Sequence, residues 1–193
     1  MITHIQGKLV SKSPTDVVIE CNGVGYHINI SLHTFSQIPD KEHLKLFTHL
    51  QVKEDAHTLY GFSSLAEREI FRLLISVSGI GANIARTMLS SLTPIQVREG
   101  IAAGDVGLIQ SVKGIGAKTA QRVIIDLKDK VLKIYDIDEV SVSKDNTNKN
   151  EALSALEVLG FVKKQAERVV DKILISQPDA NVETIIKQAL KNL

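Results

Sequence analysis

Two glycine-containing segments of this 193-residue chain resemble each other and carry residue types that can bind anions. Residues 73–89 and 108–124 share 8 of 17 positions at an offset of 35. Each segment holds the string GIGA, beginning at Gly79 and at Gly114, with a helical pattern of apolar residues on either side. A repeat at this spacing predicts a duplicated unit of two short helices joined by a tight turn.

The glycines define the expected geometry of both turns. Gly79 and Gly114 can adopt a positive φ at little cost and so end the first helix of each unit. Gly81 and Gly116 lack a Cβ, which lets the start of the second helix approach a large ligand closely. The backbone N–H groups of that helix N-terminus are then exposed, and they form a ready site for phosphate. We expect Ile80 and Ile115 to point into the core, and the small Ala85 and Ala120 to let the two short helices cross tightly.

Polar and basic side chains surround both turns and complete the predicted phosphate site. They are Ser78, Asn83 and Arg86 at the first turn, and Lys113, Lys118 and Arg122 at the second. Ser and Asn can donate hydrogen bonds to phosphate, whereas Lys and Arg add charge whose effect depends on salt. The pattern resembles the helix-hairpin-helix module, which grips nucleic-acid phosphates without reading bases. The alternative is that each side chain is only a solvated residue on a helix face.

The distribution of charge favours a nucleic-acid interface in the same segment. The whole chain has a formal charge of +1, but residues 64–133 hold 10 Lys and Arg against 6 Asp and Glu. Residues 1–63 carry 5 against 6, residues 134–150 carry 2 against 4, and residues 151–193 carry 6 of each. The basic excess therefore falls where the phosphate site is predicted.

Composition argues against several other classes of protein. The single cysteine, Cys21, allows no internal disulfide, which is typical of a reducing cytoplasm. No apolar run approaches the ~20 residues of a membrane span, and the N-terminus lacks the layout of a signal peptide. The six histidines match no zinc pattern, so we expect no metal and no cofactor. These features predict a cytoplasmic protein that does not contact membranes.

Periodicity predicts an α+β chain of several domains that begins with β-structure. Residues 1–63 contain about five short strands with alternating apolar residues, separated by turn sequences such as Asn22–Gly23. Five strands in about 60 residues favour a small barrel of the oligonucleotide-binding (OB) type. A small β-sandwich and an SH3-like barrel are the alternatives.

Residues 64–133 follow a helical period and predict an all-α domain of about five helices. Three helix starts carry capping residues, namely Ser64 with Glu67, Thr93 with Gln96, and Asp105.

The last third of the chain predicts a linker and a small bundle. Residues 134–150 are rich in Asp, Ser, Asn and Lys, a composition typical of a flexible linker. Residues 151–193 then predict three short amphipathic helices, separated at Gly160–Phe161 and at residues 177–179. A unit of 43 residues is near the lower limit for independent folding, so we expect its apolar surface to dock on a partner.

The sequence shows no enzyme site of its own. GIGAKT at Gly114–Thr119 matches only the end of a P-loop, because Ala117 and Val112 stand where glycines are required. A helix-hairpin-helix repair glycosylase or nuclease is the enzymatic alternative, but it needs a base pocket and a catalytic Asp or Lys close behind the hairpin. A protein-binding adaptor without affinity for DNA is the third hypothesis.

The order of these parts, together with several strings, resembles the RuvA family, the DNA-binding subunit of the bacterial Holliday-junction branch-migration machinery. The strings are NGVGY at 22–26, FTH at 47–49, KEDAHTLYGF at 53–62, the two GIG turns, and ALEVLGF at 155–161. The resemblance runs essentially from end to end. It implies an OB-fold barrel, a tandem helix-hairpin-helix domain, and a C-terminal three-helix bundle similar to a UBA domain.

The resemblance also implies partners. Members form homotetramers, alone or stacked face to face as octamers, that hold a four-way DNA junction open on one concave face. Their C-terminal helices bind the hexameric ATPase RuvB through an apolar patch. The RuvC resolvase is a further partner in recombination and DNA repair. The chain itself is expected to be non-catalytic, and the hydrolysis of ATP is expected in RuvB, the motor of the complex.

Roles for individual residues follow from the same resemblance. Acids in a β-hairpin form a pin at the junction centre, and here they match Glu54 and Asp55; by themselves, adjacent acids are typical of a solvated turn. The matching motor-binding residues are Leu156, Leu159, Phe161 and Leu190, for which the bundle core is the alternative. The chain departs from the family at Asn83 and Ala117, where many members carry lysine. Fewer cations predict a shallower salt dependence of DNA binding.

Overall fold

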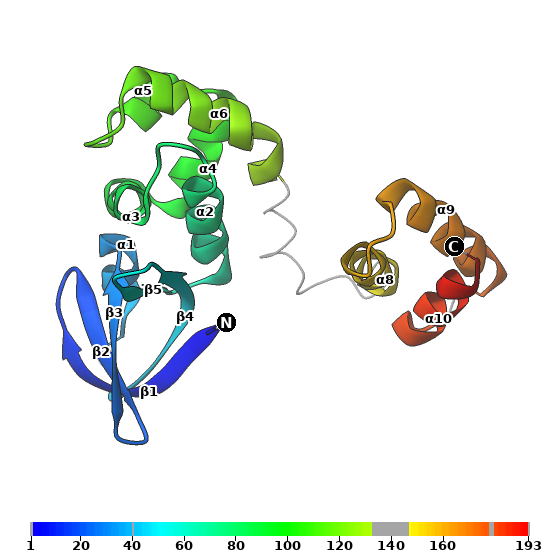
Figure 1. The fold of residues 1–193 in the computed structure, drawn as a ribbon, viewed down its shortest axis with the longest axis horizontal. Coiled ribbons are helices and arrows are strands. Elements are labelled where there is room, and N and C mark those ends of the chain that lie inside the picture. The colour runs from blue at the N-terminus through cyan, green and yellow to red at the C-terminus, as the bar shows by residue number, and fades with distance from the viewer. Residues whose placement is uncertain (1, 40, 133–146, 178–179, 193) are drawn as a thin grey trace. The chain divides into compact units, whose positions relative to one another are not determined.

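The computed structural model describes residues 2–39, 41–132, 147–177 and 180–192 (Figure 1). These residues form two compact units, which divide near residue 138. The first unit contains a β-barrel followed by helices, and the second contains the helices of the C-terminal bundle.

The first unit begins with a closed five-stranded barrel. Its strands are β1 (His4–Lys12), β2 (Asp16–Cys21), β3 (Val24–Ile30), β4 (His43–Val52) and β5 (His57–Phe62). They follow the order β1-β2-β3-β5-β4, and neighbouring strands are antiparallel except for β3 and β5. The OB-type barrel predicted from the alternating pattern is confirmed, and the two-sheet sandwich is not formed.

Alternate side chains of the strands fill the barrel, as expected when one face of each strand points inward. Ile19, Ile28 and Leu46 are among the fully buried residues of this core. A short helix, α1 (Leu32–Gln37), lies between β3 and β4. It was not predicted, because six residues are too few to show a helical period. Ser31 caps it by accepting a hydrogen bond from Thr34 N.

Five helices follow the barrel within the described part of the first unit, which confirms the helical reading of this segment. They are α2 (Leu65–Ile75), α3 (Ala82–Ser91), α4 (Pro94–Ala103), α5 (Val106–Gln110) and α6 (Ala117–Val131). Thr93 and Gln96 form the predicted capping box of α4, and Asp105 caps α5.

The cap of α2 differs from the prediction. Ser64 Oγ accepts a hydrogen bond from Glu67 N at 3.1 Å, as a capping box requires. The Glu67 carboxylate, however, does not return to the Ser64 backbone. It is buried against hydroxyl groups from elsewhere in the fold, so only one half of the predicted box forms.

The barrel and the helices share one apolar core. Tyr60 and Phe62 of β5 belong to the helical core, and their ring centroids lie 5.1 and 4.9 Å from that of Phe71 in α2. Aromatic pairs at such distances pack favourably. The change from strand to helix after β5 is therefore not a break in the core, and a domain boundary at residue 63 stays a prediction.

The second unit is a bundle of α8 (Thr147–Val158), α9 (Lys163–Ser176) and α10 (Val182–Asn192). Leu156, Val170 and Ile185 are fully buried at its centre. The helix α8 begins inside the segment predicted as a linker. Its first turns are held by tertiary contacts, because Asn148 Nδ2 donates to Ala180 O at 3.3 Å and Lys149 Nζ lies 2.5 Å from Asp171 Oδ1. The rest of the predicted linker, 134–146, lies outside the described residues.

Candidate nucleic-acid interface

The two glycine turns have the same backbone conformation. Gly79 and Gly114 have φ values of 96° and 94°, in the left-handed region that favours glycine. Gly81 and Gly116 have φ of −84° in both turns, with ψ of 164° and 165°. The predicted duplication therefore holds at the level of structure. Ile80 and Ile115 are buried in the core as predicted, and Ala85 and Ala120 are buried as well.

The helices that follow the two turns lack the side-chain caps that other helices of the first unit possess. A side-chain oxygen caps α1, α2, α4 and α5. At α3 and α6 the N-cap residues are Gly81 and Gly116, and neither supplies a side-chain acceptor. The first N–H groups of these two helices are thus available to an acceptor from outside the chain.

Space around the turns is open on the side that a ligand would occupy. A Cβ placed on Gly81, Gly114 or Gly116 would meet no heavy atom within 4 Å. These glycines are therefore not needed for packing within the chain. Their small size fits a close approach of another molecule, such as a phosphate backbone.

The first turn touches the helix that follows the second turn. Arg122 Nη1 donates to Ser78 O at 3.5 Å, and a Cβ built on Gly79 would lie 3.8 Å from Thr119 Cγ2. The two turns therefore belong to one continuous surface. The sequence analysis did not select Thr119, although its place two residues after the start of α6 could have suggested a contact.

Most of the predicted phosphate-binding side chains are solvent-exposed near the turns. Ser78, Asn83, Lys113, Lys118 and Arg122 are all exposed. Asn83 Oδ1 accepts a hydrogen bond from Tyr60 OH at 3.4 Å, which ties the start of α3 to strand β5.

Arg86 is placed differently from the prediction. Its Nη1 donates to Asn29 Oδ1 at 2.9 Å and to Thr15 O at 3.2 Å, so the guanidinium joins α3 to the barrel. Arg86 lies more than one helical turn beyond Gly81, on a side of α3 that faces the barrel. Its role as a phosphate ligand stays a prediction, and its Nη1 is held by the barrel. The other predicted cations are Lys113 and Lys118 at the second turn and Arg122, which contacts Ser78 O of the first turn.

The two acids of the predicted pin lie at the tip of the β4–β5 hairpin. Glu54 and Asp55 are exposed, and the turn is closed by a hydrogen bond from Lys53 N to Ala56 O at 2.9 Å. Neither acid forms an ion pair with any residue that the structure describes. Strand β5 leads from this tip to Tyr60, which contacts Asn83. Tyr60 lies five residues beyond Asp55, or roughly 17 Å along an extended chain, so the pin stands well apart from the first turn.

One histidine near this strand adds no charge to the site at neutral pH. His49 in β4 pairs in register with Tyr60 and packs against Phe71 at a ring-centroid distance of 5.5 Å. Burial lowers the pKa of His49, and the neighbouring charges of Arg72 and Arg68 lower it further. The imidazole is therefore neutral near pH 7, and the positive charge of the interface comes from Lys and Arg.

The predicted motor-binding residues divide into core and surface. Leu156 is fully buried at the centre of the bundle, so the prediction that it lies on an exposed patch is wrong. Phe161 is half-buried and packs against the same core after Gly160, which has a φ of 96°. Leu159 and Leu190 are exposed at 58% and 46%.

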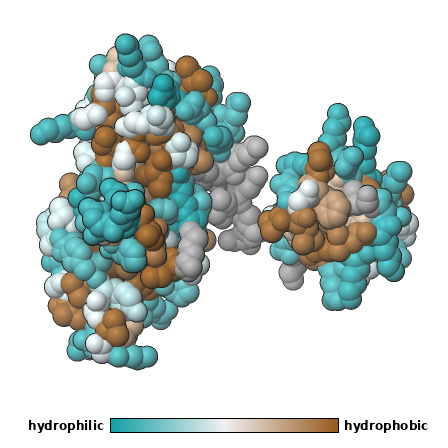
Figure 2. All heavy atoms as spheres, viewed as in Figure 1, coloured by the Kyte–Doolittle hydropathy of each residue, from teal (hydrophilic) through white to brown (hydrophobic). Residues whose placement is uncertain are grey.

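An apolar groove accompanies the exposed leucines on the second unit. It has a volume of about 510 Å³ and is lined by Glu151, Ser154, Ala155, Val158, Leu159 and Ile186. Val158 is 85% exposed and was missed by the sequence analysis, because a valine at the end of a helix looks like any other apolar position. Figure 2 shows apolar side chains gathered on the visible face of this unit.

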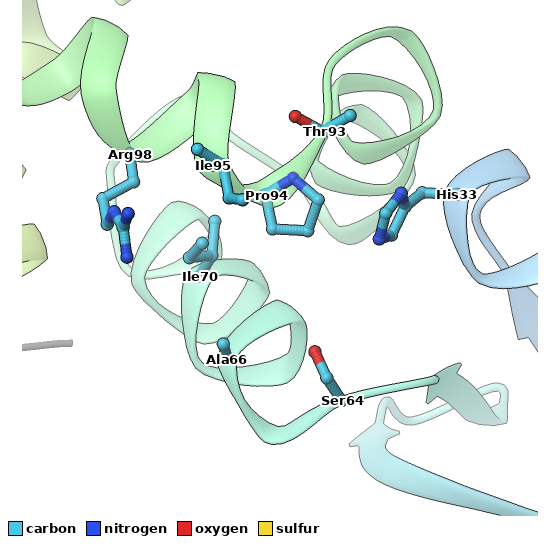
Figure 3. Close-up of a pocket in the computed structure, with 8 residues that line it drawn as sticks. All are labelled: His33, Ser64, Ala66, Ile70, Thr93, Pro94, Ile95 and Arg98. Atoms are coloured by element: carbon cyan, nitrogen blue, oxygen red, sulfur yellow. The ribbon is translucent and has the colours of Figure 1, made fainter. Parts of the chain in front are cut away.

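A second cavity, of about 260 Å³, lies between α1, α2 and α4 (Figure 3). Its lining residues are His33, Ser64, Ala66, Ile70, Thr93, Pro94, Ile95 and Arg98. Ser64 and Thr93 already use their hydroxyl oxygens as helix caps, and no Asp, Glu or Lys lines the cavity. It therefore does not offer the catalytic Asp or Lys that a repair glycosylase needs.

Among the described residues, no group of His, Cys, Asp and Glu is arranged to hold a metal ion. No helix in the described part of the chain is long and apolar enough to cross a membrane.

Comparison with known proteins gives matches along the chain. Family models for the RuvA N-terminal domain, the SAM-like helix-hairpin-helix tandem, and the RuvA C-terminal domain match residues 1–61, 71–129 and 147–193. Curated relatives from Flavobacterium psychrophilum and Christiangramia forsetii are 72% and 68% identical, over 100% of both chains. One from Cytophaga hutchinsonii is 52% identical, over 99% of both chains. Each of these relatives is named Holliday junction branch migration complex subunit RuvA.

Proposed function

Because the chain belongs to the RuvA family, we propose that it binds four-way DNA junctions and acts in branch migration during recombination and DNA repair. The observation that carries the proposal is the pair of uncapped helix N-termini behind Gly81 and Gly116. Both termini follow identical turns on one surface. Each can donate backbone N–H groups to a phosphate.

The two turns differ in how much hydrogen bonding and how much positive charge they bring to DNA. The second turn combines backbone donors with Lys113 and Lys118, whereas the first offers Ser78 and Asn83, and Arg122 lies between the turns through its hydrogen bond to Ser78 O. Neither turn is an element that could fill a groove of DNA and read base edges. Binding therefore depends on the shape and charge of the DNA backbone. Salt therefore weakens binding chiefly through the second turn.

The acidic tip of the β4–β5 hairpin gives the preference for a junction. Glu54 and Asp55 repel phosphates, so a continuous duplex laid across them is disfavoured. At the centre of an opened junction the strands separate, and carboxylates there guide each strand toward its new partner. Four copies arranged around this centre would offer two turns to each arm of the junction.

The second unit recruits the motor in this proposal. The chain acts in the cytoplasm as a non-catalytic subunit, a homotetramer that brings the RuvB ATPase to the junction. The exposed Leu159 and Leu190 and the groove beside them form the contact surface. The cavity between α1, α2 and α4 has no Asp or Lys in its lining, and no metal-binding group is found among the described residues. Neither observation favours a glycosylase or nuclease.

A competition gel shift tests the function. A synthetic four-way junction competes with linear duplex of equal length for the full-length protein, at two salt concentrations. We expect strong preference for the junction and a multi-subunit stoichiometry. The affinity should fall with a log–log salt slope of about 0.9 for each phosphate neutralised. Equal affinity for both substrates would leave only a generic phosphate-binding protein.

The motor contact is tested by replacing an exposed side chain that the bundle core does not need. Leu159→Ser should abolish the stimulation of RuvB by this protein, because a polar group would enter the apolar contact, while junction binding stays unchanged. Ile175→Ser is the matched control, since Ile175 is 82% exposed but does not line the groove. Stimulation by Leu159→Ser at the level of the control would place the contact elsewhere.

A further inference from the structure

The buried carboxylate of Glu67 is held by four hydrogen bonds. Its Oε1 accepts from Ser31 Oγ at 2.6 Å, and its Oε2 accepts from Thr34 Oγ1 at 2.7 Å. The same Oε2 also accepts from Ser63 N and Ser63 Oγ, both at 3.2 Å. Glu67, Ser31 and Thr34 are each at least 98% buried. An ionised carboxylate can only accept, and all of these partners donate to it.

The donors come from separate parts of the first unit. Ser31 and Thr34 belong to the start of α1, directly after barrel strand β3. Ser63 lies in the two-residue link between β5 and α2, and Glu67 is in the first turn of α2. The carboxylate therefore joins the barrel to the first helix of the helix-hairpin-helix region, across 33 to 36 residues of sequence.

Other contacts between the barrel and the helices fix the angle between them less firmly. Phe71 packs on Tyr60 and Phe62, and such apolar contact is not directional. Arg86 and Ser90 also contact the barrel side, through Asn29 Oδ1 and Leu32 N, but these bonds are less buried and compete with water. Charge-assisted hydrogen bonds in a buried site are stronger and fix the geometry of the groups that they join.

The angle between the barrel and the helices decides where the acidic pin stands relative to the phosphate-binding turns. Glu54 and Asp55 are on the barrel, whereas the turns at Gly79 and Gly114 are on the helices. We infer that Glu67 is a positioning residue, which holds this angle and thereby sets the preference for four-way junctions over duplex. The inference rests on the proposed function, because it assigns Glu67 a part in that selection.

Stability and positioning can be separated by design. In the double variant Glu67→Leu with Thr34→Val, apolar groups of similar shape replace both the carboxylate and the Thr34 hydroxyl, which donates to it at 2.7 Å. The double variant leaves the donors of Ser31 and Ser63 without this acceptor, so we expect it to be less stable than the parent protein, and the two are compared at a temperature where both are fully folded. Glu67→Gln is the conservative variant, since the amide keeps the shape and one accepting oxygen.

The angle itself can be measured without DNA. With Cys21→Ser as background, spin labels at Glu20→Cys on β2 and Glu99→Cys on α4 report the distance between barrel and helices in the full chain; both positions are exposed. The labelled chain is mixed with a large excess of unlabelled chain, so that an assembly holds at most one labelled copy. Under this condition we expect one narrow intramolecular distance distribution for the parent protein and for Glu67→Gln. The double variant should give a broad or shifted distribution at a temperature where it is fully folded.

The functional readout is the ratio of junction affinity to duplex affinity. We expect this ratio to fall about tenfold in the double variant, a size typical of lost coupling between neighbouring groups, while duplex affinity stays at the parent level. If the double variant does not fold, Thr34→Val alone removes one donor and should give a smaller change in the same direction.

Two results would overturn the inference. One is a folded double variant with the parent's distance distribution, and the other is a broadened distribution with an unchanged junction preference. Failure of the proposed function looks different, since the parent protein itself would then bind junction and duplex equally. The distance measurement would still report whether Glu67 holds the angle.

Discussion

Replacing both Gly79 and Gly114 with valine is expected to abolish junction binding by the folded protein. Both residues have φ near +95°, where a β-branched residue is strained by ~1–2 kcal/mol, so each turn would rearrange. The N–H groups of α3 and α6 would then no longer point at a phosphate. We expect each single variant to lose more than about tenfold in affinity, because every copy in the assembly loses the same contact. Fluorescence anisotropy with a labelled junction measures this loss.

The control must carry the same backbone strain outside the interface. Gly104→Val meets this requirement, since Gly104 ends α4 with a φ of 76° and a Cβ there would meet no atom within 4 Å. We expect it to lower the melting temperature about as much as the turn variants and to keep full junction affinity. Equal loss of binding in all three variants would show that strain alone explains the effect, and the clamp proposal would fail.

Neutralising the pin, with Glu54→Gln and Asp55→Asn together, is expected to separate binding from branch migration. Both side chains are exposed at the hairpin tip, so the change should not disturb folding. Junction affinity should stay equal or rise several-fold, because repulsion between carboxylates and phosphates is removed. Duplex affinity should rise more, so the preference for the junction falls. Branch migration driven by RuvB should change in rate, since strands are no longer guided at the centre.

Glu20→Gln is the control for the pin, because it removes an exposed acid from barrel strand β2, which pairs with β1 and β3 and not with the strands of the hairpin. We expect this control to leave the junction preference and the migration rate unchanged. The pin proposal would be contradicted by a simple loss of junction binding in the double variant. It would also be contradicted if the control and the double variant behaved alike.

Local features of the fold were predictable from the sequence. The alternation in residues 1–63 gave the barrel strands, and the GIG repeats gave both the positive φ of Gly79 and Gly114 and the burial of their apolar neighbours. The capping of α4 and α5 was predicted for the same reason. Each of these features depends on residues within one or two helical turns of each other, so the pattern of types along the chain is sufficient.

Contacts between distant segments were not predictable in the same way. Arg86 was selected as a phosphate ligand, yet it binds Thr15 and Asn29 of the barrel. Leu156 was placed on a surface, yet it is the centre of the bundle. Which face of a helix meets a neighbour depends on how helices and strands pack, and an isolated arginine or leucine fits either role.

Apart from the short helix α1, the sequence by itself determined the elements of the first unit, its two equivalent turns and its acidic hairpin, because short-range patterns dictate them. Only the tertiary structure decided that Glu67, which looked like half of a capping box, is a buried link between barrel and helices. The physical reason is that its donors, Ser31 and Thr34, lie more than 30 residues away and meet it only when the two parts pack together. The start of α8 at Thr147 was decided in the same way, by contacts of Asn148 and Lys149 with residues beyond α8.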